Sequence, residues 1–177
     1  MKSIFVAFAF LLTATLAFAQ NGEPLTGKLK ISVSPGRAGV FIDGKYVGPA
    51  ANHKRGRTYK VAAGDHEVLL VDPRYEESKS KITIHAGETV SISQKLKELP
   101  EPQGPFGMMK IKGFDKYAAV FLNGKFYAHA DELSNFTQGM RIKPGEYSVR
   151  VEPMNGNPPQ EEKVKVEEGK TVTVHSR

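Results

Sequence analysis

The sequence predicts an all-β protein built from two small antiparallel β-sandwiches in tandem. Three observations lead to this prediction. Short segments alternate apolar and polar residues with a period of two, as half-buried strands do. Glycines recur between these segments at roughly the 8–12-residue spacing of turns in sandwich proteins. The whole pattern occurs twice, and no segment beyond the N-terminal apolar run has the period of an amphipathic helix.

The two occurrences align as an internal repeat. The matched segments are residues 27–31 with 107–111, 38–45 with 118–125, 63–68 with 144–149, and 82–90 with 164–172. The offset between the copies grows by one residue twice, each time between strand-like segments, and loops tolerate such insertions better than cores do. The repeat therefore indicates duplication of a folding unit of about 70 residues.

The N-terminus predicts export. Lys2 precedes an apolar run of about 15 residues, shorter than the ~20 that a membrane-spanning helix needs. Residues 17–19 match the small-x-small pattern of signal peptidase sites, so we expect a signal peptide over 1–19 with cleavage after Ala19. An uncleaved N-terminal anchor is the alternative. We expect a periplasmic or extracellular mature chain without a transmembrane segment.

The predicted organisation of the mature chain follows from the repeat. The first sandwich is expected over residues 20–98 and the second over 106–177. Residues 99–105 contain three prolines and predict a stiff, extended linker. The chain contains no cysteine, so packing alone must stabilise both sandwiches in an oxidising compartment.

Each copy contains a two-residue hairpin signal. Asp43-Gly44 and Asn123-Gly124 each follow an alternating apolar segment, and a type I′ turn needs positive φ at both central residues. Such a turn pairs the flanking residues in order, and the predicted pairs are Ile42 with Lys45, Phe41 with Tyr46, Val40 with Val47, and Phe121 with Phe126. Further strand-to-strand turns are predicted at Gly64 and Gly145.

Residues 35–48, which include Pro35 and Ala38, resemble the opening of PEGA domains. The residues 64–66, the pair Arg74-Tyr75 and residues 87–96 are also similar to that family. The second copy lacks the proline-x-x-alanine opening and a counterpart of Tyr75, so it resembles a divergent member. The resemblance implies an immunoglobulin-like or transthyretin-like sandwich in a prokaryotic envelope or surface protein, and it implies no catalysis.

Nothing in the sequence matches a catalytic or metal-binding motif. The five histidines show no paired ligand spacing, and without cysteine there is no conventional zinc set. His129, Asp131 and Glu132 form the one local cluster of possible ligands, and we expect it to be an ordinary polar cluster. We therefore expect no catalytic residue, no metal and no cofactor.

The densest basic cluster, residues 53–57, includes Arg55 and Arg57. It is either a contact for an anionic polymer or lipid head group, or a solvated loop between the first hairpin and a strand starting near Thr58. Nucleic-acid readers place aromatic residues among the basic ones, and only Tyr59 lies close. We expect no nucleic-acid partner.

The aromatic pairs at the two hairpins offer a second candidate contact surface. The predicted pairing places Phe41 beside Tyr46 and Phe121 beside Phe126, on the face away from each module's own core. Cross-strand aromatic pairs stabilise hairpins by about 0.2–1 kcal/mol, which is one sufficient reason for them. The other is that the two patches dock a partner or each other. Both interpretations stay open at the level of sequence.

Taken together, these residues predict a non-enzymatic binding or structural module of the prokaryotic cell envelope. Its partner is expected to be an envelope protein or a surface polymer. The alternative is a secreted enzyme, or an inhibitor or accessory subunit of one, whose site the sequence does not display. The net charge of +6 for the full chain identifies no partner.

Overall fold

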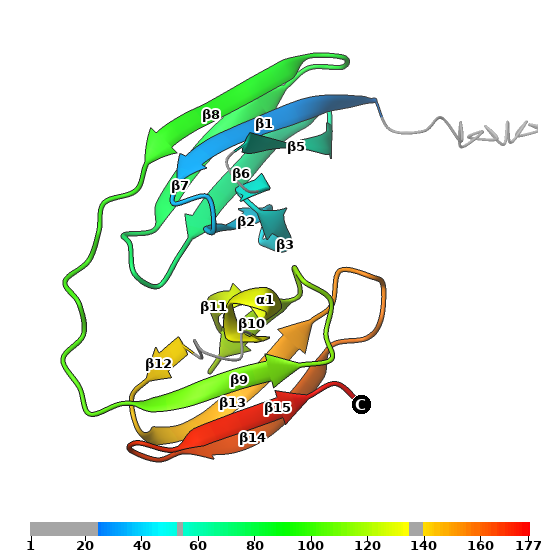
Figure 1. The fold of residues 1–177 in the computed structure, drawn as a ribbon. Coiled ribbons are helices and arrows are strands. Elements are labelled where there is room, and N and C mark those ends of the chain that lie inside the picture. Colours follow the sequence, from blue (N-terminus) through cyan, green and yellow to red (C-terminus); the bar gives the residue numbers. More distant parts are fainter. Residues whose placement is uncertain (1–24, 53–54, 135–139) are drawn as a thin grey trace, which may run out of the picture.

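The computed structural model describes residues 25–52, 55–134 and 140–177, with the side chains of Asn52 and Arg55 excepted. These residues form two β-sandwiches that lie one against the other, joined at one side by an extended segment (Figure 1). We call strands β1 to β8 the first module and the elements from β9 to β15 the second module. No helix within the described residues is long and apolar enough to cross a membrane.

The first module consists of β1 (Thr26–Ser34), β2 (Gly39–Ile42), β3 (Lys45–Pro49), β4 (Ala51–Asn52), β5 (Arg55–Ala62), β6 (Gly64–Val71), β7 (Ser78–Ile84) and β8 (Thr89–Lys95). The second consists of β9 (Gly107–Lys112), β10 (Ala119–Leu122), β11 (Lys125–His129), α1 (Ala130–Ser134), β12 (Met140–Ile142), β13 (Gly145–Glu152), β14 (Gln160–Val166) and β15 (Thr171–His175). Strands at matching repeat positions start at offsets of 80 to 82 residues, as the sequence repeat predicts, except β5 and β12, whose first residues lie 85 apart.

The two modules share one sheet topology. In the first, the sheets have the orders β4-β5-β1-β8 and β3-β2-β6-β7, and in the second β12-β9-β15 and β11-β10-β13-β14. The predicted all-β sandwich is confirmed, but each module contains one parallel pair, β1 with β8 and β9 with β15. In each module the chain passes from the hairpin-bearing sheet to the other sheet before its last strand. That strand, β8 or β15, then lies beside the first strand of the module and parallel to it.

Each module has its own apolar core between its two sheets. Leu29, Val40 and Leu70 are fully buried in the first core, and Met109 and Val149 in the second. The alternation of each strand sends one set of side chains into this core and the other set outward.

The hairpins adopt the predicted turns. Asp43 and Gly44 have φ values of 51° and 76°, and Asn123 and Gly124 have 50° and 79°. Phe41 pairs with Tyr46, and Phe121 pairs with Phe126, as predicted.

The predicted pair Val40–Val47 is wrong. Val40 pairs with Gly48, because a bulge follows the aromatic pair, and Val47 packs against the core as the extra residue. The strand expected near Thr58 also begins earlier, at Arg55.

The sequence analysis missed helix α1. Its five residues are too few to show helical periodicity, and it takes the repeat position that β4 occupies in the first module. Its Ala130 and Leu133 pack into the second core. The expected signal peptide over 1–19, its cleavage site after Ala19, and His53 and Lys54 of the basic cluster lie outside the described residues.

Candidate functional site

The outer faces of the two hairpin-bearing sheets meet in a third apolar cluster, which we call the aromatic interface. It consists of Phe41, Val71, Ala119, Phe121 and Phe126, with Tyr46 and Leu69 packed against them. Phe41 contacts Phe121 and Phe126 edge to face at ring-centroid distances of 6.3 and 5.7 Å, and Tyr46 stacks on Phe126 at 5.7 Å. Aromatic pairs of this geometry stabilise by about 0.5–1.5 kcal/mol beyond their buried area.

The aromatic interface joins equivalent positions of the repeat. Phe41 and Phe121 occupy the same site in their modules, and so do Tyr46 and Phe126. Each residue meets its own counterpart, as in the isologous interface of a two-fold dimer. The face that sequence analysis assigned away from each core is therefore covered by the other module.

Charged residues border one side of the aromatic interface. Arg37 of the first module binds Asp131 of α1 through both carboxylate oxygens, one of them at 3.1 Å from Nη1. Glu132 of α1 lies 3.5 Å from Arg37 Nη2 and 3.6 Å from Arg74 Nη2. Helix α1 thus presents two carboxylates to two arginines of the first module.

The protonation of these groups reflects their pairing. Burial alone raises the pKa of Glu132, but hydrogen bonds from the ring and backbone N–H of His129 and the charge of Arg37 bring it below its ordinary value. Hydrogen bonds to Asp72 raise the pKa of Arg74. Glu132 and Arg74 are therefore both charged across the neutral range.

His129 connects the charged border to the aromatic cluster. Its side chain is fully buried, its Nδ1 lies 2.9 Å from Glu132 Oε1, and its ring lies 5.3 Å from that of Phe126. Its Nε2 is buried without a hydrogen-bond partner within the described residues. The ring is thus held by one hydrogen bond and by aromatic packing. The polar cluster predicted from the sequence is a structural part of the module interface, with its carboxylates bound to arginines.

Arg57 contributes to the interface rather than to a solvated loop. It lies within β5, and its guanidinium is 5.7 Å from the ring centroid of Tyr59 and 5.1 Å from that of Tyr117 in the second module. Tyr46 adds a second link, since its hydroxyl donates to the carbonyl oxygen of Tyr117 at 3.0 Å. Arg55 begins β5, and its side chain lies outside the described part of the chain.

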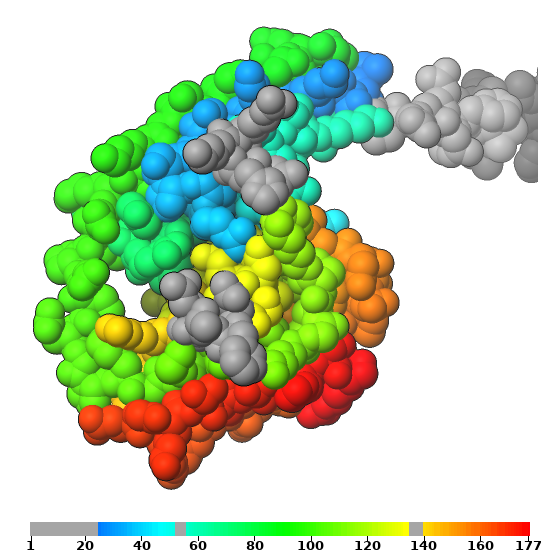
Figure 2. Space-filling view, viewed as in Figure 1, coloured from blue at the N-terminus to red at the C-terminus, as the bar shows by residue number. Residues whose placement is uncertain are grey.

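A groove with a volume of about 780 Å³ opens beside the aromatic interface. Phe41, Phe121 and Phe126 form its buried floor, and the extended segment after β8 contributes Leu99, Pro102 and Phe106 to its wall. Figure 2 shows this segment as the left margin of the molecule, with the surface hollowed between it and the two modules. The groove exists because both modules and the linker enclose it.

The linker is attached at its first residues. Leu99 N–H donates to the carbonyl of Arg74 at 2.8 Å, and Glu76 N–H donates to the carbonyl of Lys97 at 2.8 Å. These bonds fix the start of the linker against the loop between β6 and β7, which also lines the groove.

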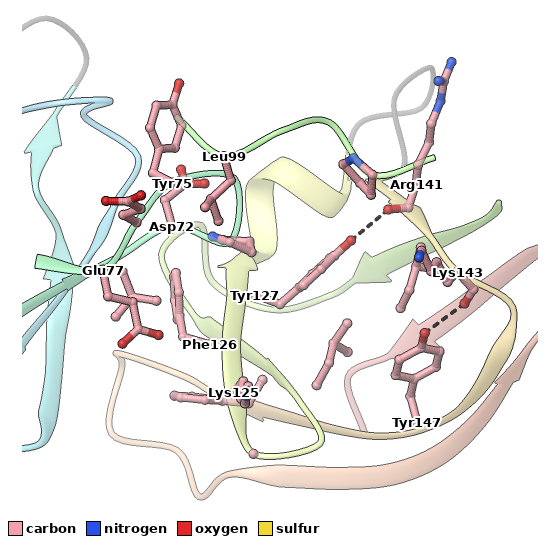
Figure 3. A pocket seen from close by; sticks show the side chains of 18 of the residues that line it. Asp72, Tyr75, Glu77, Leu99, Lys125, Phe126, Tyr127, Arg141, Lys143 and Tyr147 are labelled. Atoms are coloured by element: carbon pink, nitrogen blue, oxygen red, sulfur yellow. Dashed lines mark hydrogen bonds between the residues drawn. The ribbon is translucent and has the colours of Figure 1, made fainter. Parts of the chain in front are cut away.

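The two rims of the groove carry opposite charges. The loop after β6 supplies Asp72, Glu76 and Glu77, while the second module supplies Lys125, Arg141 and Lys143. Figure 3 shows Glu77 and Lys143 at opposite sides, with Tyr127 between them.

Two tyrosines hold the basic rim. The hydroxyl of Tyr127 donates to the carbonyl of Arg141 at 2.8 Å, and the hydroxyl of Tyr147 donates to the carbonyl of Lys143 at 2.9 Å (Figure 3). Burial raises the pKa of Tyr127 to about 12, so the phenol keeps its proton at neutral pH. The short edge strand β12 is thereby fixed beside the groove.

The structure places the residues predicted from the sequence in two different parts of the molecule. Phe41, Tyr46, Phe121 and Phe126 come together, but as an internal interface and groove floor rather than as an open external patch. The turn residues Asp43, Gly44, Asn123 and Gly124 lie at the hairpin tips, and Gly64 and Gly145 begin β6 and β13. Sequence reasoning missed Arg37, Arg74, Lys125, Arg141 and Lys143, because their places at the interface or the groove depend on how the modules meet.

Comparisons with solved structures give weak likenesses. The Bacillus anthracis TIE protein aligns with 86% of this chain and 34% of its own, at 17% identity and a TM-score of 0.35. The Bacteroides ovatus mixed-linkage glucan utilization protein SGBP-B, solved with a mixed-linkage heptasaccharide, aligns over 84% and 44% at 15% identity and a TM-score of 0.21. The chain spans about a third of the first and under half of the second.

No curated protein is similar to the chain in sequence. The sequence model of the PEGA domain family, in contrast, matches residues 26–100. This segment contains every strand of the first module, from β1 to β8, and the attached start of the linker. Residues 26–100 of this chain therefore belong to the PEGA domain family.

Proposed function

We propose that this chain is a non-enzymatic binding module of the prokaryotic cell envelope, made of a PEGA domain and a divergent second copy that act as one unit. The PEGA match at residues 26–100 and the expected signal peptide support the setting. The sheet orders of the two modules match except for β4, which has no strand counterpart in the second, and this match supports the second copy. The partner is an envelope protein or a surface polymer.

The observation that carries this proposal is the groove. A single binding surface of about 780 Å³ is formed jointly by both modules and the linker. Its floor is aromatic, its charged groups lie at the rims, and the hydroxyls of Tyr127 and Tyr147 are bound to carbonyls. Apolar floors with a few polar groups at the margin are typical of ligand sites. This arrangement favours holding a partner over activating a bond.

Photocrosslinking in the envelope tests the proposal. A photoreactive residue replaces Tyr75 or Leu99 at the groove, and matched chains carry it at Lys30 or Lys112, which are exposed on the sheets away from the other module. We expect defined adducts from the groove positions alone in the organism that makes the protein. Adducts of equal yield from Lys30 and Lys112, or none from the groove, contradict the proposal.

A further inference from the structure

The groove has a chemical preference that follows from its lining. Among the described residues around it, none is Asn, Gln, Ser, Thr or His. A neutral glycan exposes hydroxyl groups along its whole length, and those buried on the phenylalanine floor would have no side-chain hydrogen-bond partner there, which is costly. The groove instead offers aromatic and aliphatic surface between charged rims. A ligand with large apolar groups and a few charges fits this lining better than an uncharged sugar chain.

The ion pairs at the two rims indicate which sign of charge a ligand of the groove carries. On the acidic rim, Asp72 is bound by Arg74 and Glu76 by Lys97 at 2.7 Å, which leaves Glu77. On the basic rim, Lys125 and Lys143 have no acidic partner within residues 25–52, 55–134 and 140–177. Arg141 lies at the outer margin, where its side chain extends away from Tyr127 (Figure 3). Lys125 and Lys143 outnumber Glu77, so the net unpaired charge at the groove is positive.

The remaining acid argues against a uniformly anionic ligand. A polymer or membrane surface with negative charge throughout meets Lys125 and Lys143 on one side but Glu77 on the other, and like charges brought together oppose binding. A ligand whose negative charge is local avoids this repulsion. A polypeptide can carry acidic side chains at a few positions and apolar side chains at the positions beside them.

We propose, on the basis of the binding function proposed above, that the groove takes an extended peptide segment of a partner protein, in which acidic residues flank one or two large apolar side chains. The apolar side chains pack on the floor formed by Phe41, Phe121 and Phe126. The acidic side chains face Lys125 and Lys143. Tyr127 and Tyr147, through the carbonyls of Arg141 and Lys143, keep this rim in place before the peptide arrives.

Fluorescence anisotropy on the full mature chain tests the peptide class. The probes are an array of labelled eight-residue peptides in which Asp or Glu alternates with Phe, Tyr or Leu in every spacing. Two control arrays replace the acids by Lys, or the apolar residues by Ala. We expect binding from the first array, at least about tenfold weaker binding from the lysine array, and roughly thirtyfold weaker binding from the alanine array.

A pair of matched variants places the peptide in the groove. Lys125→Gln/Lys143→Gln is expected to weaken the best acidic peptide about tenfold at low salt and less at high salt, because exposed charges act through screened attraction. The control Lys30→Gln/Lys112→Gln removes the same charge from the outer sheets and is expected to leave binding unchanged. Equal loss in both variants, or loss in neither, overturns the assignment of the peptide to the groove.

Neutral β-glucan oligosaccharides and phosphatidylglycerol vesicles are tested in parallel. If either binds in competition with groove crosslinks while no acidic peptide binds, the peptide class is wrong and the binding function stands. If no probe binds and the groove positions give no adducts in the envelope, the binding function itself fails.

Discussion

At the scale of single residues, the first hairpin tip is fixed by an acid and a histidine. Asp43 accepts hydrogen bonds from the backbone N–H of Glu67 at 2.9 Å and from His66 Nδ1 at 2.7 Å. The bond to Asp43 raises the pKa of His66, and the bond from Glu67, followed by that from His66, lowers the pKa of Asp43. In the second module Asn123 and Tyr147 stand at these positions, so the titrating pair is confined to the first.

This pair makes the stability of the first module depend on pH. The pKa of His66 is raised on folding, so its contribution is fully present below the ordinary value of 6.5 and is lost as the pH rises through the folded value. We expect the unfolding temperature to fall as the pH rises from about 6.5 through the folded pKa of His66. His66→Gln should remove that decline, while His85→Gln, at an exposed histidine, should keep it. Identical pH profiles for wild type and His66→Gln contradict this reading.

The turn glycines give a second residue-scale prediction. A Cβ at Gly44 or Gly124 meets no atom within 4 Å, so the cost of a substitution comes from the backbone alone. Gly44→Val and Gly124→Val should each lower the free energy of unfolding by more than about 1 kcal/mol, because β-branched residues avoid positive φ. Gly44→Asn should cost less, since Asn adopts this region readily. Denaturant midpoints that are equal for Val, Asn and wild type contradict the prediction.

Local chemistry explains which residues could be predicted from the sequence. The turns at Asp43 and Asn123 depend on two adjacent residues, and the outward face of Phe41 depends on a period of two. The contacts of Arg37, Arg57 and Glu132 depend on partners in the other module, far along the chain. No local pattern encodes such distant pairs, so these contacts could not be predicted from the sequence.

At the scale of elements, β2 approaches the second module closely enough that one strand position must be glycine. A Cβ at Gly39 would lie 2.8 Å from Cζ of Phe126, within a buried cluster. The matching residue in the second module is Ala119, which is itself buried in the aromatic interface. The two faces are thus similar but not interchangeable.

Gly39→Val should therefore separate the modules while each keeps its core. We expect the calorimetric trace to change from one transition to two, because the added side chain displaces Phe126 rather than a residue of either core. The control Lys30→Gln, on the outer sheet, should keep a single transition. A single transition in Gly39→Val, at the wild-type temperature, would mean that the aromatic interface does not couple the modules.

Helix α1 gives the interface its acid sensitivity. The pKa of Glu132 is lowered on folding, so its contribution is present above the ordinary value of 4.5 and is lost as the pH falls through the folded value. We expect the modules of the wild type to separate below about pH 4.5. Glu132→Gln should weaken docking at neutral pH by about 1–3 kcal/mol and remove the acid transition. Calorimetry measures both effects as the difference between the unfolding temperatures of the two modules. A variant whose modules still separate at the same acid pH as the wild type contradicts the role given to Glu132.

At the scale of the whole molecule, the duplication accounts for the shape of the binding surface. A face repeated in both modules packs on its own counterpart, and the linker then passes along one side and encloses the groove. We propose domain bounds of 20–98 and 106–177, with residues 99–105 as the linker. The sandwich class and the repeat could be predicted from the sequence, whereas the docking of the modules could not, because the outward aromatic pairs fit an external partner equally well.

If the two modules form one unit with a fixed groove, the distance between them is fixed as well. The chain contains no cysteine, so Lys30→Cys/Lys112→Cys carries a spin label on the outer sheet of each module and nowhere else. Electron–electron double resonance on this chain at neutral pH measures the distance distribution between the modules. We expect one narrow distribution, which broadens when Gly39→Val is added. A broad distribution in the parent chain would show that the modules move independently, and it would contradict the claim.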